Sequence, residues 1–464
     1  MTAEGTLNAT SIEAWQRDGF VHLPALLGPD IRDCLSRWAD EIAASDDDRV
    51  LQHHEMTDNG PVLARSEHFA TVHPELGPLV RDGQIVRAGR ELLGEPIVLY
   101  KEKINHKLPG GAGFAPHQDA TAYRFVGMHL TCMVAIDDST IENGCLEVVA
   151  GQHHELFTDD GDGCLPPSTE RALDWRPIEM RAGDVLWFHS RTPHRSSANG
   201  SHRARRALFL TYNAAAEGDL RSAYYADKIE QLHNRAGGKR ARVSTIGHFL
   251  GRAVPDEGRS DLPDIGAGSV PWMRLQTAAD VADAIIDLYE RKGASNYDEA
   301  VTQLSHALQC GDRALDRGAT TEEVVAAFLH DIGHLLVDEH DGHGDFLARD
   351  LHHEDVGARF LANWFGPSIT EPIRLHVPAK RYLCAVDPGY HDGLSLASVR
   401  SLDVQGGPMS NDEVAEFLAA EGSATAVELR RCDDLAKVAD ASMSSLDSFR
   451  ALIESVVTIQ APSN

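Results

Sequence analysis

Cysteine and long apolar runs are scarce in this chain of 464 residues. The seven cysteines are odd in number, scattered, and form no Cys-x-x-Cys motif, which argues against a disulfide framework or a structural zinc site. No apolar run is long enough to span a bilayer, and the first residues lack the basic and apolar regions of a signal peptide. We therefore expect a cytoplasmic protein with no membrane partner.

Positive charge is also in short supply. Lysine and arginine number 43 against 71 aspartates and glutamates, which gives a formal net charge of −28. A field of this sign disfavours nucleic acid, and also anionic small substrates unless basic residues are concentrated at the binding site. With only nine tyrosines and six tryptophans, the chain has little material for an aromatic cage around a quaternary ammonium group.

Histidine is abundant, with 24 residues, and its most informative position is the run Leu329-His330-Asp331-Ile332-Gly333-His334. The apolar neighbours predict that this segment is buried, and burying the carboxylate is costly unless a cation meets it. On one continuous helix over 321–336, His330 and His334 would face the same way. Further candidate ligands lie before and after this run: His306, His353, His376 and Asp433. Six such ligands suit two metal ions, and mixed imidazole and carboxylate ligation suits iron.

The first 235 residues have a mixed pattern that becomes β-rich after Pro96. A short helix with Ser11 as its N-cap, a strand near Gly19 and an amphipathic helix over 28–45 are predicted first. Short strands between turns are then predicted over 97–105, 128–136, 145–149, 184–189 and 207–212. This pattern indicates a β-sandwich or barrel.

His117-Gln118-Asp119 is a His-x-Asp motif within this β-rich region. On an extended segment the side chains at i and i+2 share one face, so one strand end can present both to one ion. His194 follows the strand over 184–189 and would complete a triad of two histidines and one carboxylate, which suits iron(II) with open positions for substrate and oxygen. Arg205 could form a bidentate pair with a carboxylate, although it also lies in a basic run typical of solvated surface.

The segments 103–110, 117–119, 143–146, 151–153 and 194–207 together resemble the phytanoyl-CoA dioxygenase family. Its members are iron(II)/2-oxoglutarate oxygenases with a double-stranded β-helix, or jelly-roll, cupin-like fold. The resemblance implies that His117, Asp119 and His194 bind iron, and that Arg205 pairs with the distal carboxylate of 2-oxoglutarate, helped by Asn105 and Ser196. Relatives that halogenate lack the carboxylate, so its presence here favours hydroxylation.

Residues 236–275 are rich in turn-forming and charged residues and are predicted to be a linker between a first domain, 1–235, and a second domain, 276–464. The second domain is predicted to be all-α, with helices over 278–290, 299–315, 321–336, 353–364 and 411–420. The fold class is therefore multidomain α+β.

The second domain carries motifs at 297–306, 330–334, 353–358, 376–383, 394–398, 405–408 and 430–434. Together they resemble the HD-domain mixed-valence diiron oxygenases, and most of all those that cleave the carbon–phosphorus bond of 1-hydroxyphosphonates. The resemblance implies two irons, bridged by Asp331 and held by His306, His330, Asp331, His353, His376 and Asp433. It implies phosphonate contacts from His334, Lys380, Ser398 and Ser401, with local positive charge from Lys380 and Arg430.

The same resemblance implies that Glu299 caps an iron until substrate displaces it, with Tyr297 closing over it. Tyr297 lies two residues before Glu299, where the family pattern has three. The sequence also leaves open His352 in place of His353, and Asp434 in place of Asp433.

These observations favour a bifunctional enzyme of oxidative phosphonate catabolism. The first domain would hydroxylate C1 of 2-aminoethylphosphonate or a close analogue, using iron(II), 2-oxoglutarate and O2, with ascorbate as an aid in vitro. The second would use O2 and an Fe(II)/Fe(III) pair to cleave the product to glycine, or an analogous acid, and phosphate. Alternatives are an HD phosphohydrolase in the second half, or a phosphonate-binding sensor or scaffold with one degenerate half. A shorter alkylphosphonate substrate and a homo-oligomeric state are left open.

Overall fold

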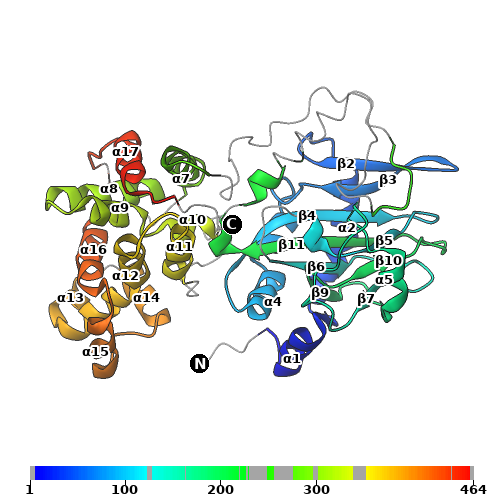
Figure 1. The fold of residues 1–464 in the computed structure, drawn as a ribbon, viewed down its shortest axis with the longest axis horizontal. Coiled ribbons are helices and arrows are strands. Elements are labelled where there is room, and N and C mark those ends of the chain that lie inside the picture. Colours follow the sequence, from blue (N-terminus) through cyan, green and yellow to red (C-terminus); the bar gives the residue numbers. More distant parts are fainter. Residues whose placement is uncertain are drawn as a thin grey trace. The chain divides into compact units, whose positions relative to one another are not determined.

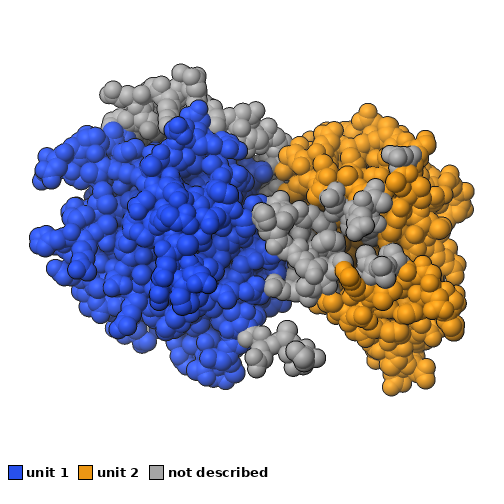
Figure 2. Space-filling model, turned by 180° about the vertical axis from the view of Figure 1, so that it is seen from behind, with its two compact units in different colours: residues 1–214, 219–268 blue, residues 215–218, 269–464 orange. Residues whose placement is uncertain are grey.

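The structure is a computed structural model in which the chain forms two compact units (Figures 1 and 2). It describes residues 6–122, 128–161, 163–218, 220–225, 228, 248–254, 275–295, 301–337, 352–394, 396–439 and 441–459. Unit 1 comprises Met1–Ala214 and Asp219–Gly268, and unit 2 comprises Ala215–Gly218 and Ser269–Asn464. Among the described residues, no helix combines the length and apolar character needed to cross a membrane.

Unit 1 is built on two antiparallel sheets (Figure 1). One has seven strands in the order β1-β9-β6-β11-β4-β3-β2, and the other has four in the order β5-β10-β7-β8. The strands are β1 (Phe20–Leu23), β2 (Leu51–Thr57), β3 (Gly60–Glu67), β4 (Ile97–Lys107), β5 (Phe114–His117), β6 (His129–Ala135), β7 (Leu146–Val149), β8 (Trp175–Ile178), β9 (Val185–His189), β10 (His194–Ser196) and β11 (Arg205–Ala214). The predicted β-rich fold is confirmed to the extent of these two antiparallel sheets.

Two apolar cores lie on opposite faces of the seven-stranded sheet, because successive side chains of a strand point to opposite sides. On β6, Leu130, Cys132 and Val134 join the larger core with residues from the helices, whereas Met133 and Ala135 join the smaller core with residues of β7. The helical elements of unit 1 are α1 (Ala9–Asp18), α2 (Pro29–Ala43), α3 (Leu76–Asp82), α4 (Gln84–Leu93), η1 (Asp119–Thr121) and α5 (Pro167–Ala172). The smaller core joins residues of β6, β9 and β11 to residues of β7 and therefore lies between the two sheets.

Unit 2 is helical in its described part (Figure 1). Its elements are η2 (Ala215–Glu217), α7 (Ala278–Lys292), α8 (Gln303–Asp316), α9 (Thr321–Leu329), α10 (Ile332–Leu336), α11 (His353–Leu361), α12 (Pro367–Val386), α13 (Pro388–Asp392), α14 (Leu396–Val404), α15 (Asn411–Ala419), α16 (Ser423–Leu435) and α17 (Leu446–Val456). Helix α12 was not predicted, because it contains Pro372 and Pro378 and an interior proline costs about 3 kcal/mol. Its packing against α9, α11 and α16 offsets that cost.

The predicted continuous helix over 321–336 is wrong. Helix α9 ends at Leu329 and α10 begins at Ile332, and Asp331 between them has φ −101° and ψ 12°, outside the helical region. His330 and His334 therefore do not lie on one helix face. The N-cap prediction is also wrong: Asn8, not Ser11, caps α1, and its Oδ1 accepts a hydrogen bond from the Ser11 amide at 2.9 Å.

The stretch predicted as a linker contributes to unit 1 where it is described. The amide of Ala115 donates to the carbonyl of His248 at 2.7 Å, and the amide of Met56 donates to the carbonyl of Arg252 at 2.7 Å. Residues 248–254 therefore add backbone hydrogen bonds to both β5 and β2. The pattern of turn-forming residues did not show this, because the contacts are far apart in sequence.

Candidate metal centres

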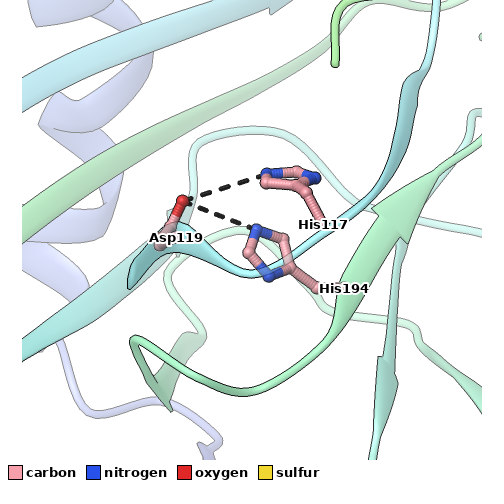
Figure 3. A group of neighbouring side chains, drawn as sticks. All are labelled: His117, Asp119 and His194. Carbon is pink, nitrogen blue, oxygen red and sulfur yellow. Dashed lines mark ion pairs between the residues drawn. The ribbon is translucent and has the colours of Figure 1, made fainter. Parts of the chain in front are cut away.

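The first candidate centre lies in unit 1 and consists of His117, Asp119 and His194 (Figure 3). His117 is the last residue of β5 and His194 the first of β10, and the two residues are paired in the four-stranded sheet. The Oδ1 atom of Asp119 lies 3.9 Å from His117 Nε2 and 3.8 Å from His194 Nε2. All three side chains are buried, and the predicted triad is brought together.

Hydrogen bonds aim the ligand atoms of this triad. The Nδ1 atom of His117 lies 2.7 Å from the carbonyl of Ala115, and that of His194 lies 3.0 Å from the carbonyl of Thr192. Thr131 donates its hydroxyl to Asp119 Oδ2 at 2.8 Å. The two Nε2 atoms and Asp119 Oδ1 are thus left to converge, which is the arrangement that outer partners impose on metal ligands.

The protonation states also fit a metal. Burial, and then the neighbouring His194, lower the pKa of His117 to about 3, so this imidazole is neutral and able to ligate at pH 7. Burial raises the pKa of Asp119, but its histidine neighbours outweigh burial and hold the pKa below its ordinary value. Two neutral imidazoles and one carboxylate on a buried site fit an iron(II) ion.

The residues expected to hold 2-oxoglutarate lie on β4, β10 and β11. Arg205 is buried, its Nη2 donates to the carbonyl of Gly144 at 2.7 Å, and its Nε has no hydrogen-bond partner. Ser196 accepts a hydrogen bond from Lys107 Nζ at 2.9 Å, and Asn105 accepts one from Arg65 Nε at 3.1 Å. Lys107, which contacts Ser196, is opposite Arg205 in the β4–β11 ladder, and Asn105 lies two residues before Lys107 on β4. The roles of these residues stay a prediction.

Sequence reasoning missed Lys107 and His248. Lys107 faces Arg205 across the β4–β11 ladder, and burial followed by the Arg205 charge lowers its pKa to about 6. His248 stacks on His117 with ring centroids 3.9 Å apart and an interplanar angle of 5°. Lys107 lies within the segment 103–110, which carries part of the family resemblance, and could have been singled out there, whereas nothing in the local sequence marks His248.

The second candidate centre lies in unit 2 and is organised around Asp331. Its Oδ2 lies 3.1 Å from His330 Nε2 and 3.4 Å from His306 Nε2. Its Oδ1 lies 3.3 Å from His353 Nε2 and 3.4 Å from His376 Nε2. Each carboxylate oxygen thus faces its own pair of imidazoles, as a carboxylate shared by two metal ions would.

The remaining acidic ligand candidate lies on the His306 side. Asp433 Oδ1 is 3.4 Å from His306 Nε2, and its Oδ2 pairs with Arg430 Nη1 at 2.6 Å. Asp434 instead accepts hydrogen bonds from Arg430 and from the hydroxyl of Tyr390. The structure thus places Asp433 in the cluster and Asp434 in the layer around it.

The histidine rings of this cluster are oriented as in the first centre. The Nδ1 atoms of His306, His330 and His376 lie 2.9, 2.8 and 2.6 Å from the carbonyl oxygens of Ala436, Ala327 and Ile373. Their Nε2 atoms therefore point inward. Five imidazole and carboxylate side chains buried around Asp331 fit cations, because such a group is otherwise costly to bury.

The structure separates the alternatives at 352 and 353 by position. His353 is buried at the start of α11 with its Nε2 on Asp331, whereas the side chain of His352 is 60% exposed. His334 lies 3.9 Å from Asp331 and stacks on His353 at 3.8 Å between ring centroids. Tyr297 and Glu299 lie outside the described residues.

Three of the predicted phosphonate contacts, Lys380, Ser398 and Ser401, lie together next to the cluster. Lys380, one helical turn after His376 on α12, donates from Nζ to Ser401 Oγ at 2.6 Å. Lys437 Nζ lies 3.5 Å from Ser398 Oγ and 3.6 Å from Asp433 Oδ1. Burial, and then the Arg430 charge, lower the pKa of Lys380 to about 7. Arg430 forms ion pairs with Asp433 and Asp434. Its main role in the structure is therefore to position the ligand candidate Asp433, and not to contact a substrate.

A buried triad of two histidines and a carboxylate between antiparallel sheets is typical of non-haem iron oxygenases. The comparisons with known proteins agree, since a family model described as phytanoyl-CoA dioxygenase (PhyH) matches residues 15–207. The chain belongs to the phytanoyl-CoA dioxygenase family.

Three similar proteins act on phosphonates according to their names. Methylphosphonate hydroxylase of Gimesia maris is 42% identical over 252 residues, which cover 53% of this chain and 97% of the relative. Hydroxymethylphosphonate dioxygenase of the same organism is 50% identical over 180 residues, which cover 39% of this chain and 90% of the relative. 2-Aminoethylphosphonate dioxygenase of an uncultured bacterium is 40% identical over 225 residues, which cover 47% and 86%.

Proposed function

We propose that the chain carries out two consecutive oxidations of a phosphonate. Unit 1 would hydroxylate C1 with O2 and 2-oxoglutarate, which yields succinate and CO2. Unit 2 would then use a second O2 to cleave the carbon–phosphorus bond of the 1-hydroxyphosphonate, which yields a carboxylic acid and phosphate. The observation that carries this proposal is the presence of both a buried iron-type triad and a carboxylate shared between two imidazole pairs in one chain.

The names of the relatives support the order of the two steps. Hydroxylation of methylphosphonate gives hydroxymethylphosphonate, and both compounds appear in the names of similar proteins from one organism. A third relative is named for 2-aminoethylphosphonate, the substrate that the sequence favours, and this compound is also a phosphonate. An HD-type diiron centre in unit 2 is part of the proposal.

In unit 1 the triad would hold iron(II), whose chemistry when bound is the activation of O2. Lys107, Arg205 and Ser196 would neutralise and orient the dicarboxylate cosubstrate. Thr131 keeps Asp119 Oδ2 engaged, so that Oδ1 stays directed at the metal position. The apolar core between the sheets reaches the triad through Phe188, whose ring centre lies 4.8 Å from that of His194.

In unit 2 the imidazoles of His306, His330, His353 and His376, together with the Asp331 carboxylate, would hold two irons. Lys380 and Ser401 would bind the phosphonate oxygens. Among the described residues the ammonium group of Lys380 donates to the Ser401 hydroxyl, and its further N–H groups can donate to an anion. Arg430 would fix Asp433 by their 2.6 Å contact.

The test is phosphorus NMR of the iron-loaded full chain with methylphosphonate or 2-aminoethylphosphonate, in air and without oxygen. We expect phosphate only when 2-oxoglutarate and O2 are both present. The D119A variant should give no product but should still release phosphate from a supplied 1-hydroxyphosphonate. The D331A variant should stop at the hydroxyphosphonate. Phosphate release without oxygen would favour a phosphohydrolase in unit 2, and no turnover of any phosphonate would refute the proposal.

A further inference from the structure

Unit 1 contains a cluster of four cationic side chains, Arg65, Lys101, Lys103 and Lys228, which we call the cationic cluster. On β4, Lys101 and Lys103 share the face that also carries Asn105, since side chains two apart point the same way. In the β3–β4 ladder, Arg65 is opposite Asn105 and Glu67 is opposite Lys103. Arg65, Lys101 and Lys228 are buried, and Lys103 is partly exposed.

The negative charge facing this cluster is smaller than its positive charge. Glu67 is buried among the four cations, and it pairs with Arg65 Nη1 at 3.2 Å and with Lys228 Nζ. The neighbouring Glu102 is bound instead by Arg221 and by the amide of Ala70. Among the described residues, Arg65, Lys103 and Lys228 therefore share Glu67, and Lys103 also has Asp119 near it.

Two of the cations have bonding capacity to spare. Arg65 Nη2 is buried and has no hydrogen-bond partner. The structure shows no hydrogen bond from Lys103 Nζ to a described residue; the atom lies 5.2 Å from the centre of the Phe209 ring. Burying unmatched charge is costly, so the site is arranged for an anion that completes it.

The cluster lies beside the first metal centre. Arg65 Cζ is 5.8 Å from the centre of the Phe114 ring, and Phe114 is 5.6 Å from His248, the residue that stacks on His117. Lys103 is close enough that its charge and that of Asp119 stabilise each other. The cosubstrate residue Lys107 lies further along β4, beyond Asn105, and Arg205 is opposite it on β11.

We propose that the cationic cluster binds the phosphonate group of the first substrate and selects a phosphonate whose alkyl group carries no ammonium. This inference rests on the proposed function and specifies its substrate class. An ammonium group placed among these cations would need its own carboxylate, and Glu67 is already shared by Arg65 and Lys228. It would also find the Tyr224 ring already flanked by cations, because Lys101 and Lys228 lie 5.0 and 5.9 Å from its centre.

Steady-state succinate formation by the iron-loaded full chain tests the proposal, because only the first reaction makes succinate. In K103M and R65M we expect the KM for methylphosphonate to rise about tenfold or more, while the KM for 2-oxoglutarate changes by less than about twofold. In the wild type, 2-aminoethylphosphonate should have a KM about tenfold or more above that of methylphosphonate. The matched control is R37M, because Arg37 is half-exposed and paired with Glu41 and Glu75.

A second readout does not depend on metal or turnover. The phosphorus NMR line of methylphosphonate should broaden on addition of the metal-free full chain, and the broadening should fall in K103M but not in R37M. Unit 2 is the same in all three proteins, so the difference reports unit 1. Because R65M leaves Glu67 with less positive charge, the charge-balanced double variant R65M/E67Q is measured with it, and thermal unfolding shows whether each variant is folded.

The outcomes distinguish a failure of this inference from a failure of the proposed function. If K103M and R65M/E67Q raise the KM for 2-oxoglutarate and not that for methylphosphonate, the cluster serves the cosubstrate and the inference is overturned. Equal KM values for the two phosphonates in the wild type would overturn the selectivity. If no phosphonate supports succinate formation, the proposed function fails, and the inference with it.

Discussion

Gly333 offers a test of the second centre that changes no ligand. A Cβ atom on Gly333 would lie 1.9 Å from the carbonyl oxygen of His353 and 2.7 Å from its carbonyl carbon. A carbon and a carbonyl oxygen are comfortable at about 3.3 Å, so the His353 backbone would have to retreat by about 1.4 Å in G333A. Metal–ligand distances tolerate only about 0.2 Å of error. The variant should therefore lose the metal position that contains His353 and keep the triad of unit 1.

The size of the effect can be estimated for stability as well. Overpacking of this kind costs about 2 kcal/mol, which corresponds to a fall of about 4–8 °C in the Tm of a unit of roughly 200 residues. Iron content per chain, calorimetry and phosphate release from a supplied 1-hydroxyphosphonate are the measurements. We expect less iron and at least about 100-fold slower phosphate release, because a 1 Å misplacement alone costs that much. Succinate formation should be unchanged.

The control for this variant is G366A in the same unit. A Cβ atom on Gly366 meets nothing within 4 Å, and its φ of −76° is accessible to alanine. This variant should keep its iron and its activity. If G333A also binds iron with wild-type stoichiometry and releases phosphate at the wild-type rate, the close packing of α10 on α11 does not hold the cluster and the reasoning is wrong.

Three further outcomes follow from the described contacts. D119A should lower succinate formation at least about 100-fold, because even partners outside the ligand set cost 10–100-fold; wild-type succinate rates would contradict the triad. Lys107, with its pKa lowered to about 6, is neutral at pH 8 and should take up a proton when the 2-oxoglutarate dianion binds. Calorimetry in buffers of different ionisation heat should detect uptake at pH 8 that disappears below pH 6, and none at pH 8 would refute this. D433N should lower the iron content of unit 2, whereas D434N should not; equal losses would argue against placing only Asp433 in the cluster.

The metal ligand candidates could be found from the sequence because each motif is short. His117 and Asp119 are two residues apart at a strand end, and His330 and Asp331 are adjacent, so local geometry already limits where their side chains can point. The structure brings them together with the distant His194 and His306. The family resemblance predicted that His194 and His306 join these motifs, whereas the periodicity of the sequence did not.

The break between α9 and α10 could not be found in this way. The apolar spacing through Leu329, Ile332 and Leu336 is that of one helix. The close approach of Gly333 to the His353 carbonyl joins positions 20 residues apart, and the contacts of Asp331 with His306 and His376 join positions 25 and 45 residues apart. Such tertiary contacts override local propensity.

The cationic cluster could not be predicted from the sequence either, because it too depends on contacts between distant segments. Lys101 and Lys103 alternate with other residues on what reads as a half-polar strand, and Lys228 joins Glu67 across 161 residues of chain. The formal net charge of −28 also gives no indication that cations are concentrated at one site. The pairing of β3 with β4 is what turns dispersed lysines and an arginine into one site.

The acidity of the chain and its proposed anionic substrate are reconciled by where the cations lie. Charges on the surface act over about 8 Å at physiological salt before screening weakens them, whereas buried charges are screened much less. A few cations inside unit 1, and Lys380 inside unit 2, can therefore dominate the free energy of a bound phosphonate although acidic residues outnumber basic ones in the chain as a whole. The price is slower association, because the outer field repels an anion. The same field disfavours nucleic acid, which has too many phosphates to fit inside either site. The charge distribution thus favours a small dianion that can leave the surface and enter a buried site.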